Sequence, residues 1–128
     1  MAENILSIVE SAYRATLEEQ DDPIVWLAHA LRASGAATHL LLRGNAVNYG
    51  VRDQDASGLR FGARAQTQPP RIDRDLLALI DKGGEVFYIR DDASIRGIRP
   101  DEVIPGLKPV KTTDLPALFR RFDRVWHW

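Results

Sequence analysis

The chain contains no cysteine, and it has only three histidines and one methionine among its 128 residues. Without cysteine there are no disulfides, no thiolate metal sites, no cysteine nucleophiles and no persulfide carriers. With only His29, His39 and His127, the sequence does not indicate a multi-histidine metal site either. We therefore expect no bound metal and no cofactor.

An excess of charge and long apolar runs are also missing. The formal net charge is -1, so attraction to nucleic acid or to an anionic membrane is not expected. No apolar run approaches the ~20 residues that span a bilayer. The first ten residues, MAENILSIVE, lack the basic start and apolar core of a signal peptide. We expect no nucleic-acid partner, no membrane association and a cytoplasmic location.

What the chain does contain is typical of an ordinary globular domain, with 45% hydrophobic and 27% charged residues. A chain of this length can bury roughly two-thirds of the surface that it exposes when unfolded. There is no internal repeat, and no linker-like stretch suggests a boundary. The sequence therefore predicts a single domain over residues 1–128.

Short apolar runs alternate with helical patterns along the chain. The runs predict strands at Asn4–Val9, Ala37–Leu42, Glu85–Ile89, Leu107–Thr112 and Arg124–Trp128. The segments between them predict helices at Pro23–Ser34, Asp73–Lys82, Asp92–Arg96 and Asp114–Arg121. This alternation predicts an α/β fold with three layers (α/β/α), in which helices cover both faces of a Rossmann-like parallel sheet of about five strands.

Helix ends are marked by capping residues. Asp22 and Pro23 predict the start of the first helix, and Gly35 predicts its end. Asp73 and Thr113 are the expected N-caps of two later helices.

Three segments have weaker patterns. Ala15–Gln20 predicts either a loose helical turn or a loop, and Ala46–Val51 predicts a short helix. Arg52–Pro70 is long and irregular, which in a compact domain is typical of a lid, a subunit contact or a disordered loop.

Polar residues follow several of the predicted strands. In a parallel sheet the carboxyl ends of the strands meet at one edge, where ligands bind in open α/β folds. The backbone N–H groups at the helix starts there favour anions. The candidate ligand-binding residues are Tyr13, Arg14, Arg43, Asn45, Asn48, Arg90, Asp91 and Asp92. They predict a site for a carboxylate or phosphate group, and the alternative is that they are capping and subunit-contact residues.

The adjacent pair Asp91 and Asp92 allows two interpretations. Two carboxylates at a strand end can bind a hard cation or act as an acid and a base. However, adjacent side chains usually point apart, and aspartate is a preferred residue at a helix start. The second interpretation is favoured, and no catalytic residue is assigned.

The sequence resembles the DsrE/DsrF-like family, which includes the sulfur-relay subunits TusB, TusC and TusD. Members of this family often contain a run of the type V-Y-V-C-x-x-C-x-x-A-R-G-I, and VFYIRDDASIRGI lies in register with it. The resemblance covers nearly the whole chain. The other segments that carry it are the N-terminal strand with its polar turn, DDPIVWLAHALRASGA, HLLLRGNAVNYGV and DLPALFRRFDRVWHW.

The resemblance implies a Rossmann-like fold, homo- or hetero-oligomers that are often trimers or hexamers, and sulfur-relay proteins as partners. It also implies a persulfide-carrying cysteine at the end of the third strand. Alignment on Arg96-Gly97 places the two family cysteines at Ile89 and Asp92, and neither is a cysteine here. The expected function is therefore that of a cysteine-free, non-catalytic partner subunit in sulfur trafficking or of a small-ligand-binding oligomer. The alternative is an enzyme that acts on a small anionic substrate at the edge of the sheet.

Overall fold

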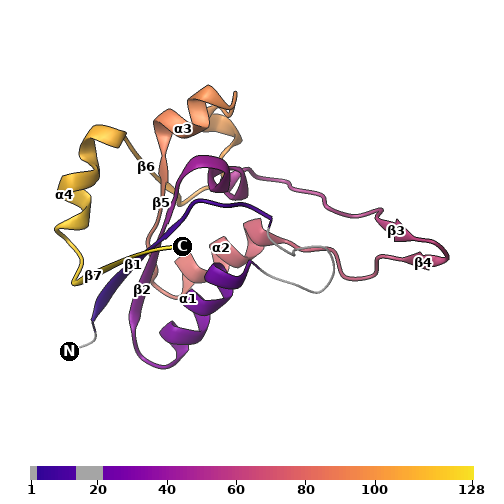
Figure 1. Ribbon diagram of the computed structural model, residues 1–128, viewed down its shortest axis with the longest axis horizontal. Coiled ribbons are helices and arrows are strands. Elements are labelled where there is room, and N and C mark those ends of the chain that lie inside the picture. Colours follow the sequence, from indigo (N-terminus) through magenta and orange to yellow (C-terminus); the bar gives the residue numbers. More distant parts are fainter. Residues whose placement is uncertain (1–2, 14–21) are drawn as a thin grey trace.

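A five-stranded sheet forms the centre of the computed structural model, which describes residues 3–13 and 22–128 (Figure 1). The strand order is β6-β5-β2-β1-β7, and every neighbouring pair in it is parallel. The strands are β1 (Asn4–Val9), β2 (Ala37–Leu42), β5 (Val86–Ile89), β6 (Lys108–Val110) and β7 (Arg124–His127). The predicted α/β fold class is confirmed.

Helices cover both faces of this sheet, as Figure 1 shows. The helices are α1 (Pro23–Ala33), α2 (Ile72–Asp81), α3 (Arg90–Ile95) and α4 (Leu115–Phe119), with 3₁₀ helices η1 (Gly44–Gly50), η2 (Pro100–Glu102) and η3 (Thr112–Asp114). Residues of α1 and α2 pack on one face of the sheet, and residues of α4 pack on the other. Within the described ranges, no helix has the length and apolarity that crossing a membrane requires.

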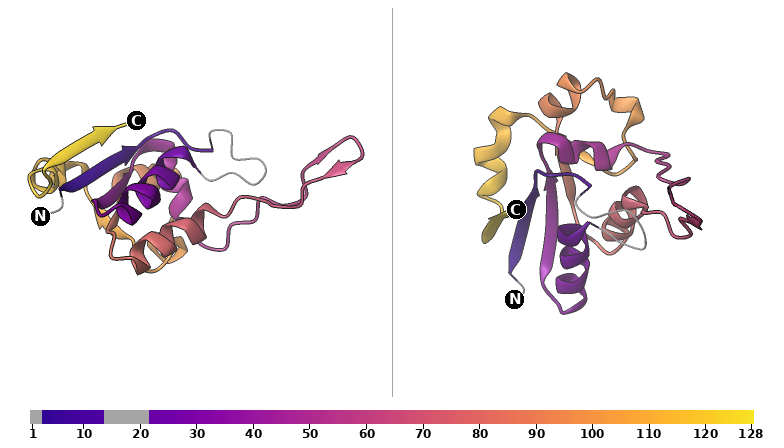
Figure 2. Two further views of the ribbon diagram at one scale, coloured as in Figure 1. Left: turned by 90° about the horizontal axis from the view of Figure 1, so that it is seen from below. Right: turned by 45° about the vertical axis from the view of Figure 1, so that its right-hand side comes forward.

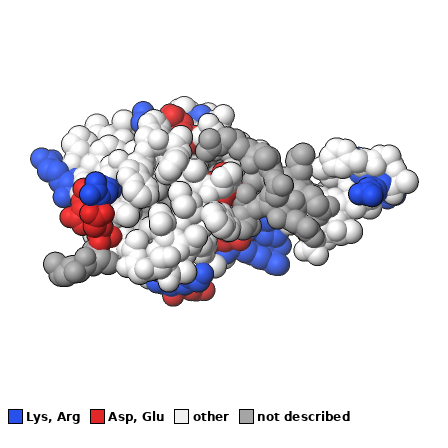
Figure 3. Space-filling model, turned by 60° about the horizontal axis from the view of Figure 1, so that its bottom comes forward, with Lys and Arg blue, Asp and Glu red and all other residues white. Residues whose placement is uncertain are grey.

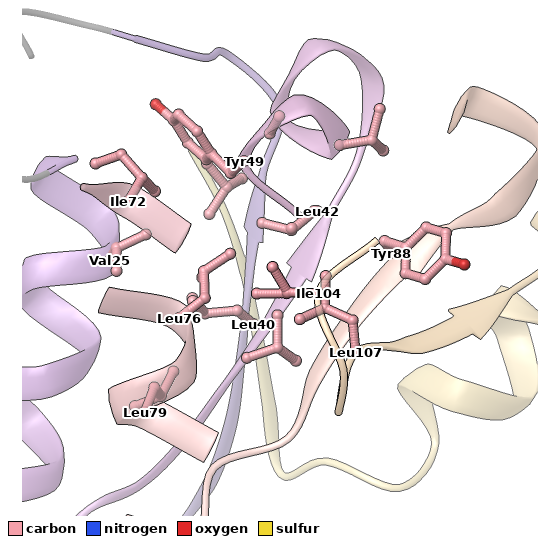
Figure 4. Packing of buried hydrophobic residues seen from close by; sticks show 14 of the residues in the cluster. Val25, Leu40, Leu42, Tyr49, Ile72, Leu76, Leu79, Tyr88, Ile104 and Leu107 are labelled. Carbon is pink, nitrogen blue, oxygen red and sulfur yellow. The ribbon is translucent and has the colours of Figure 1, made fainter. Parts of the chain in front are cut away.

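The central strands are apolar because both of their faces are buried, which is typical of parallel sheets. Side chains alternate between the faces, so Leu40 and Leu42 belong to one apolar cluster and Leu41 to the other. Figure 4 shows Leu40 and Leu42 of β2 among helix and loop side chains such as Leu76 and Ile104. Each fully buried leucine stabilises the fold by about 1.5–3 kcal/mol.

The first helix begins and ends as its sequence predicts. Oδ1 of Asp22 accepts hydrogen bonds from the backbone N–H groups of Ile24 (2.9 Å) and Val25 (3.2 Å), and Pro23 is the first helical residue. Gly35 follows the helix with φ of 101°, a conformation that glycine adopts without strain. Two local signals therefore mark where this helix begins and where it ends.

Two other predicted caps are wrong. Helix α2 begins at Ile72, one residue before Asp73, and the N-cap residue Arg71 forms no side-chain capping bond. The carboxylate of Asp73 instead accepts two hydrogen bonds of 3.1 Å from the guanidinium of Arg71. Thr113 lies inside η3, where the carboxylate of Asp114 accepts the N–H of Lys111 (3.2 Å).

The long segment Arg52–Pro70, which we call the arm, contains a small hairpin that the sequence did not predict. Strands β3 (Arg60–Phe61) and β4 (Arg64–Ala65) pair in antiparallel fashion around a tight turn, in which Gly62 has φ of 60°. Figures 1 and 2 show the hairpin standing away from the body of the protein. The segment expected at Ala15–Gln20 lies outside the described residues.

Candidate functional site

All five strands of the main sheet run in the same direction, so their carboxyl ends lie along one edge. We call the residues that follow these ends the rim. Glu10, Arg43, Arg90 and Lys111 directly follow β1, β2, β5 and β6. In Figure 1, α3 lies at this edge, near the 3₁₀ helix that follows β2. The rim is therefore built by segments far apart in the sequence.

Asp92 binds the start of a helix other than its own. Helix α3 begins at Arg90, two residues earlier than the sequence predicts, so Asp92 lies inside its first turn. Its Oδ2 atom accepts the backbone N–H of Gly44, the first residue of η1, at 2.8 Å. This is the position at a helix start that a bound anion takes in other proteins. The carboxylate of Asp92 thus occupies that position in η1.

Asp91 makes an equivalent contact with a different segment, the start of η3. Its Oδ2 atom accepts the backbone N–H of Thr112 in η3 at 2.9 Å. Hydrogen bonds from the backbone and side chain of Thr112, with the nearby charges of Lys111 and Arg90, hold the pKa of Asp91 below its usual value. The two carboxylates therefore point to different segments. Among residues 3–13 and 22–128, no group of three or more His, Cys, Asp or Glu side chains is placed to hold a metal ion.

Asn45 is held by Arg96, a residue that the sequence analysis used only to align the chain with the resembling family. Its Oδ1 atom accepts hydrogen bonds from Nε (3.1 Å) and Nη2 (3.0 Å) of Arg96, and Nη1 of Arg96 donates to the carbonyl of Asp92 (3.1 Å). Asn48 donates from Nδ2 to the backbone carbonyl of Asn45 (2.8 Å). No local pattern indicates the contact between Arg96 and Asn45, because the two residues lie 51 positions apart.

Arg43 belongs to an exposed chain of polar contacts at the ends of β1, β2 and β7. Nε of Arg43 lies 3.7 Å from Oε1 of Glu10, and Nε2 of His127 lies 3.0 Å from the other carboxylate oxygen. All three side chains are between two-fifths and one-half exposed. Exposed pairs of this kind contribute about 0–1 kcal/mol. Arg90 is exposed at the start of α3.

Tyr13 lies in a separate cluster, next to Tyr49 and the buried Asp22. The hydroxyl of Tyr49 donates to Oδ2 of Asp22 (2.6 Å) and accepts the backbone N–H of Tyr13. The two tyrosine rings meet edge to face, with centroids 4.9 Å apart. Burial and the hydrogen bond to Asp22 raise the pKa of Tyr49, so its hydroxyl stays protonated. Arg14 lies outside the described residues.

The structure thus brings together some of the predicted site residues and separates others. Arg43, Asn45, Asp91 and Asp92 share the rim, whereas Tyr13 faces the start of α1. The backbone N–H groups that start η1 and η3 are both bonded to carboxylates of α3. Sequence reasoning also missed a groove of about 540 Å³ that contains none of the predicted site residues and is lined by Leu27, Leu31, Val125, Trp126, His127 and Trp128.

Two solved structures are similar to this chain in fold. The crystal structure of the ychN protein from E. coli matches with a TM-score of 0.73 and 21% sequence identity, covering 98% of this chain and 99% of that one. MTH1491 from Methanobacterium thermoautotrophicum, a protein of unknown function, matches with a TM-score of 0.61 and 13% identity, covering 97% and 98% of the two chains. No family model and no curated protein sequence matches the chain. At these identities the similarity establishes the fold alone, and it agrees at that level with a DsrE-like fold.

Proposed function

We propose that this chain is a non-catalytic, DsrE-like partner subunit that binds other proteins of a sulfur-trafficking assembly and carries no sulfur itself. The observation that carries the proposal is Ile89, the last residue of β5. In the resembling family, a cysteine stands at this place in sulfur-transferring members. Ile89 has no nucleophilic atom, and it is only 1% exposed within an apolar cluster that includes Leu41 and Leu118.

The hydrogen bonds of the rim support a binding role through protein contacts over one through a small anion. At the starts of η1 and η3, the backbone N–H groups of Gly44 and Thr112 already bind the carboxylates of Asp92 and Asp91. A second anion there would have to displace a carboxylate of the chain itself. The starts of η1 and η3 are therefore better suited to hold α3 in place than to hold a small substrate.

Sulfur transfer in the presence and absence of a partner tests this function. The chain is incubated with a persulfide donor, and its intact mass is measured. We expect no sulfur on this chain, because no residue of it can form a persulfide. When a cysteine-bearing DsrE-like protein from the same cell is added, we expect a stable complex and faster sulfur transfer to that protein. Sulfur bound to this chain, or no complex, would overturn the proposal.

A titration separates this function from the enzyme alternative. Backbone amide NMR signals of Gly44 and Thr112 are followed while thiosulfate or inorganic phosphate is added. If the rim acts on small anions, these two amides shift and saturate. We expect them to stay unchanged, because each is bonded to an aspartate of α3. The amide of Gly97, at the end of α3, is the control for a general salt effect.

A further inference from the structure

An apolar groove lies on the side of the molecule where α1 and β7 meet. Leu27 and Leu31 of α1 form one wall, and the residues Val125–Trp128 form the other. Val125 and Trp128 are 38% and 42% exposed, and the rings of Trp126 and Trp128 meet edge to face with centroids 6.2 Å apart. Figure 3 shows few charged side chains over the middle of this face. Large apolar side chains gathered at one exposed place are typical of an interaction site.

The wall formed by β7 is also an open edge of the sheet. In the described sheet β7 pairs only with β1, so its outer side has unpaired backbone N–H and C=O groups. At the opposite edge, β6 carries Lys108 and Pro109, which are residues that block the addition of another strand. Strand β7, with the sequence RVWH, contains neither lysine nor proline. This contrast indicates that β7 accepts a further strand.

The hairpin of the arm is exposed. All four residues of β3 and β4 are exposed, including Phe61, which is 62% exposed. A two-stranded hairpin alone is marginally stable in water, so it needs a surface to pack against. In Figure 1 and the left view of Figure 2, the hairpin extends into open space, away from the sheet.

The charges of the hairpin and of the body are complementary. The segment Leu59–Gln66 contains two arginines and no acidic residue, whereas the rest of the chain has 15 basic and 18 acidic residues. In Figure 3 the arm carries basic side chains at its far end. Opposite net charges increase the rate at which such surfaces meet. The body of a second copy is therefore an electrostatically suitable partner for the hairpin.

We infer that the groove between α1 and β7 binds the arm of a second copy of this chain. A strand of the arm's hairpin pairs with the open edge of β7, and Phe61 enters the groove beside Trp126 and Trp128. This arrangement covers with one contact three exposed features of residues 3–13 and 22–128: the open edge, the apolar groove and the hairpin. Each copy offers one arm and one groove, so two copies can exchange arms, or several can close a ring.

This interface is independent of the sulfur-trafficking role. A chain that fails to bind a cysteine-bearing partner can still assemble through its arm. A chain that does not self-assemble in this way can still be a partner subunit. A negative result in the sulfur assay therefore leaves the arm interface standing, and a negative result in the experiment below leaves the sulfur-trafficking role standing.

Because the chain contains no cysteine, single introduced thiols report the contact directly. Phe61→Cys and Trp128→Cys variants, one of them carrying a size tag, are mixed and oxidised, since Trp128 lines the groove and is 42% exposed. We expect a disulfide-linked dimer that contains one chain of each kind, because the two positions lie in contact across the interface. The matched control pairs Phe61→Cys with Ile95→Cys, since Ile95 is 79% exposed at the end of α3. The control mixture is expected to form far less dimer.

The same experiment distinguishes other assemblies. Efficient cross-linking of Trp128→Cys with itself would mean that two copies meet directly through β7, and cross-linking of Phe61→Cys with itself would mean that two arms pair. Either result overturns the inference, as does a mixture that forms no more dimer than the Ile95 control. As a second measurement, Phe61→Ser should reduce the mass in solution to that of the 14.4 kDa monomer, with an unchanged circular dichroism spectrum. A Phe61→Ser variant that keeps the mass of the natural chain would also overturn it.

Discussion

His39 shows how a single buried residue makes the stability of this fold depend on pH. The ring lies near the amino ends of β2 and β5, where its Nδ1 atom accepts the backbone N–H of Glu85 (2.9 Å). Its Nε2–H group donates to Oδ1 of Asn4 (2.8 Å). With one nitrogen accepting, the ring is neutral. Burial and the charge of Arg32 lower the pKa of His39 below its ordinary value, which agrees with this geometry.

We predict that the protein loses stability as the pH falls below about 6.5. In the unfolded chain His39 takes up a proton near that pH, whereas in the folded chain it does so only at lower pH, where its lowered pKa lies. The unfolded state then binds more protons, so the free energy of unfolding falls with pH. Above about 6.5 the stabilisation is fully present. Denaturant unfolding at a series of pH values between about 5 and 7.5 measures the slope.

Substitution of His39 tests whether its ring causes this dependence of stability on pH. In His39→Gln the free energy of unfolding should vary less over this pH range, although its value at neutral pH is lower. His127→Gln, which replaces an exposed histidine, should keep the slope of the natural chain. If His39→Gln and the natural chain have parallel pH profiles, the ring does not control the dependence. The carboxylates with lowered pKa values, such as Asp73 and Glu85, affect stability only at still lower pH.

At the scale of elements, the short helix α3 joins two other segments through its carboxylates. It has only six residues, too few to be stable by itself. Asp92 bonds it to the start of η1, and Asp91 bonds it to the start of η3. These contacts hold together the chain segments that follow β2, β5 and β6.

We predict that Asp92→Ala destabilises the fold by about 1 kcal/mol, the usual effect of losing a side-chain cap. The N–H of Gly44 then loses its partner. Asp92→Asn should cost less, because its amide oxygen can still accept this hydrogen bond. Asp101→Ala is the matched control, since it breaks an exposed pair with Arg99 and should change stability by less than about 0.5 kcal/mol. Equal stability of Asp92→Ala and the natural chain would contradict this role. Chemical denaturation measures all three variants.

At the scale of the whole molecule, an arm that binds a second copy links stability to concentration. A protein that assembles in its folded state melts at a higher temperature when it is more concentrated. We therefore predict that the melting temperature of the natural chain rises with concentration and that the melting temperature of Phe61→Ser does not. Calorimetry over a wide concentration range measures both. A dependence that is equal in the two proteins would show that the assembly does not use the arm.

Contacts between segments far apart in the chain are the part of the structure that the sequence does not predict. The bounds of β1 and β2 and the cap at Asp22 follow from local signals, namely short apolar runs and an Asp-Pro helix start. The strand order and the bond between Asp92 and Gly44, 48 residues apart, depend on packing that no local pattern contains. The hairpin in the arm was missed because its strands have two residues each, too few for an alternating pattern. Of the candidate site, the sequence indicated the residues at the rim but not which carboxylate binds which segment.

The burial of Ile89 has a consequence for how such a protein can evolve. Substitution of Ile89 by cysteine alone would not create a sulfur carrier. The surroundings of Ile89, which include Ile8, Phe87 and Leu115, are apolar and closed to solvent. A thiol introduced there would have a raised pKa and would rarely form the thiolate that attacks a sulfur donor. Several further substitutions in the covering layer would be needed before a cysteine at this position could carry sulfur.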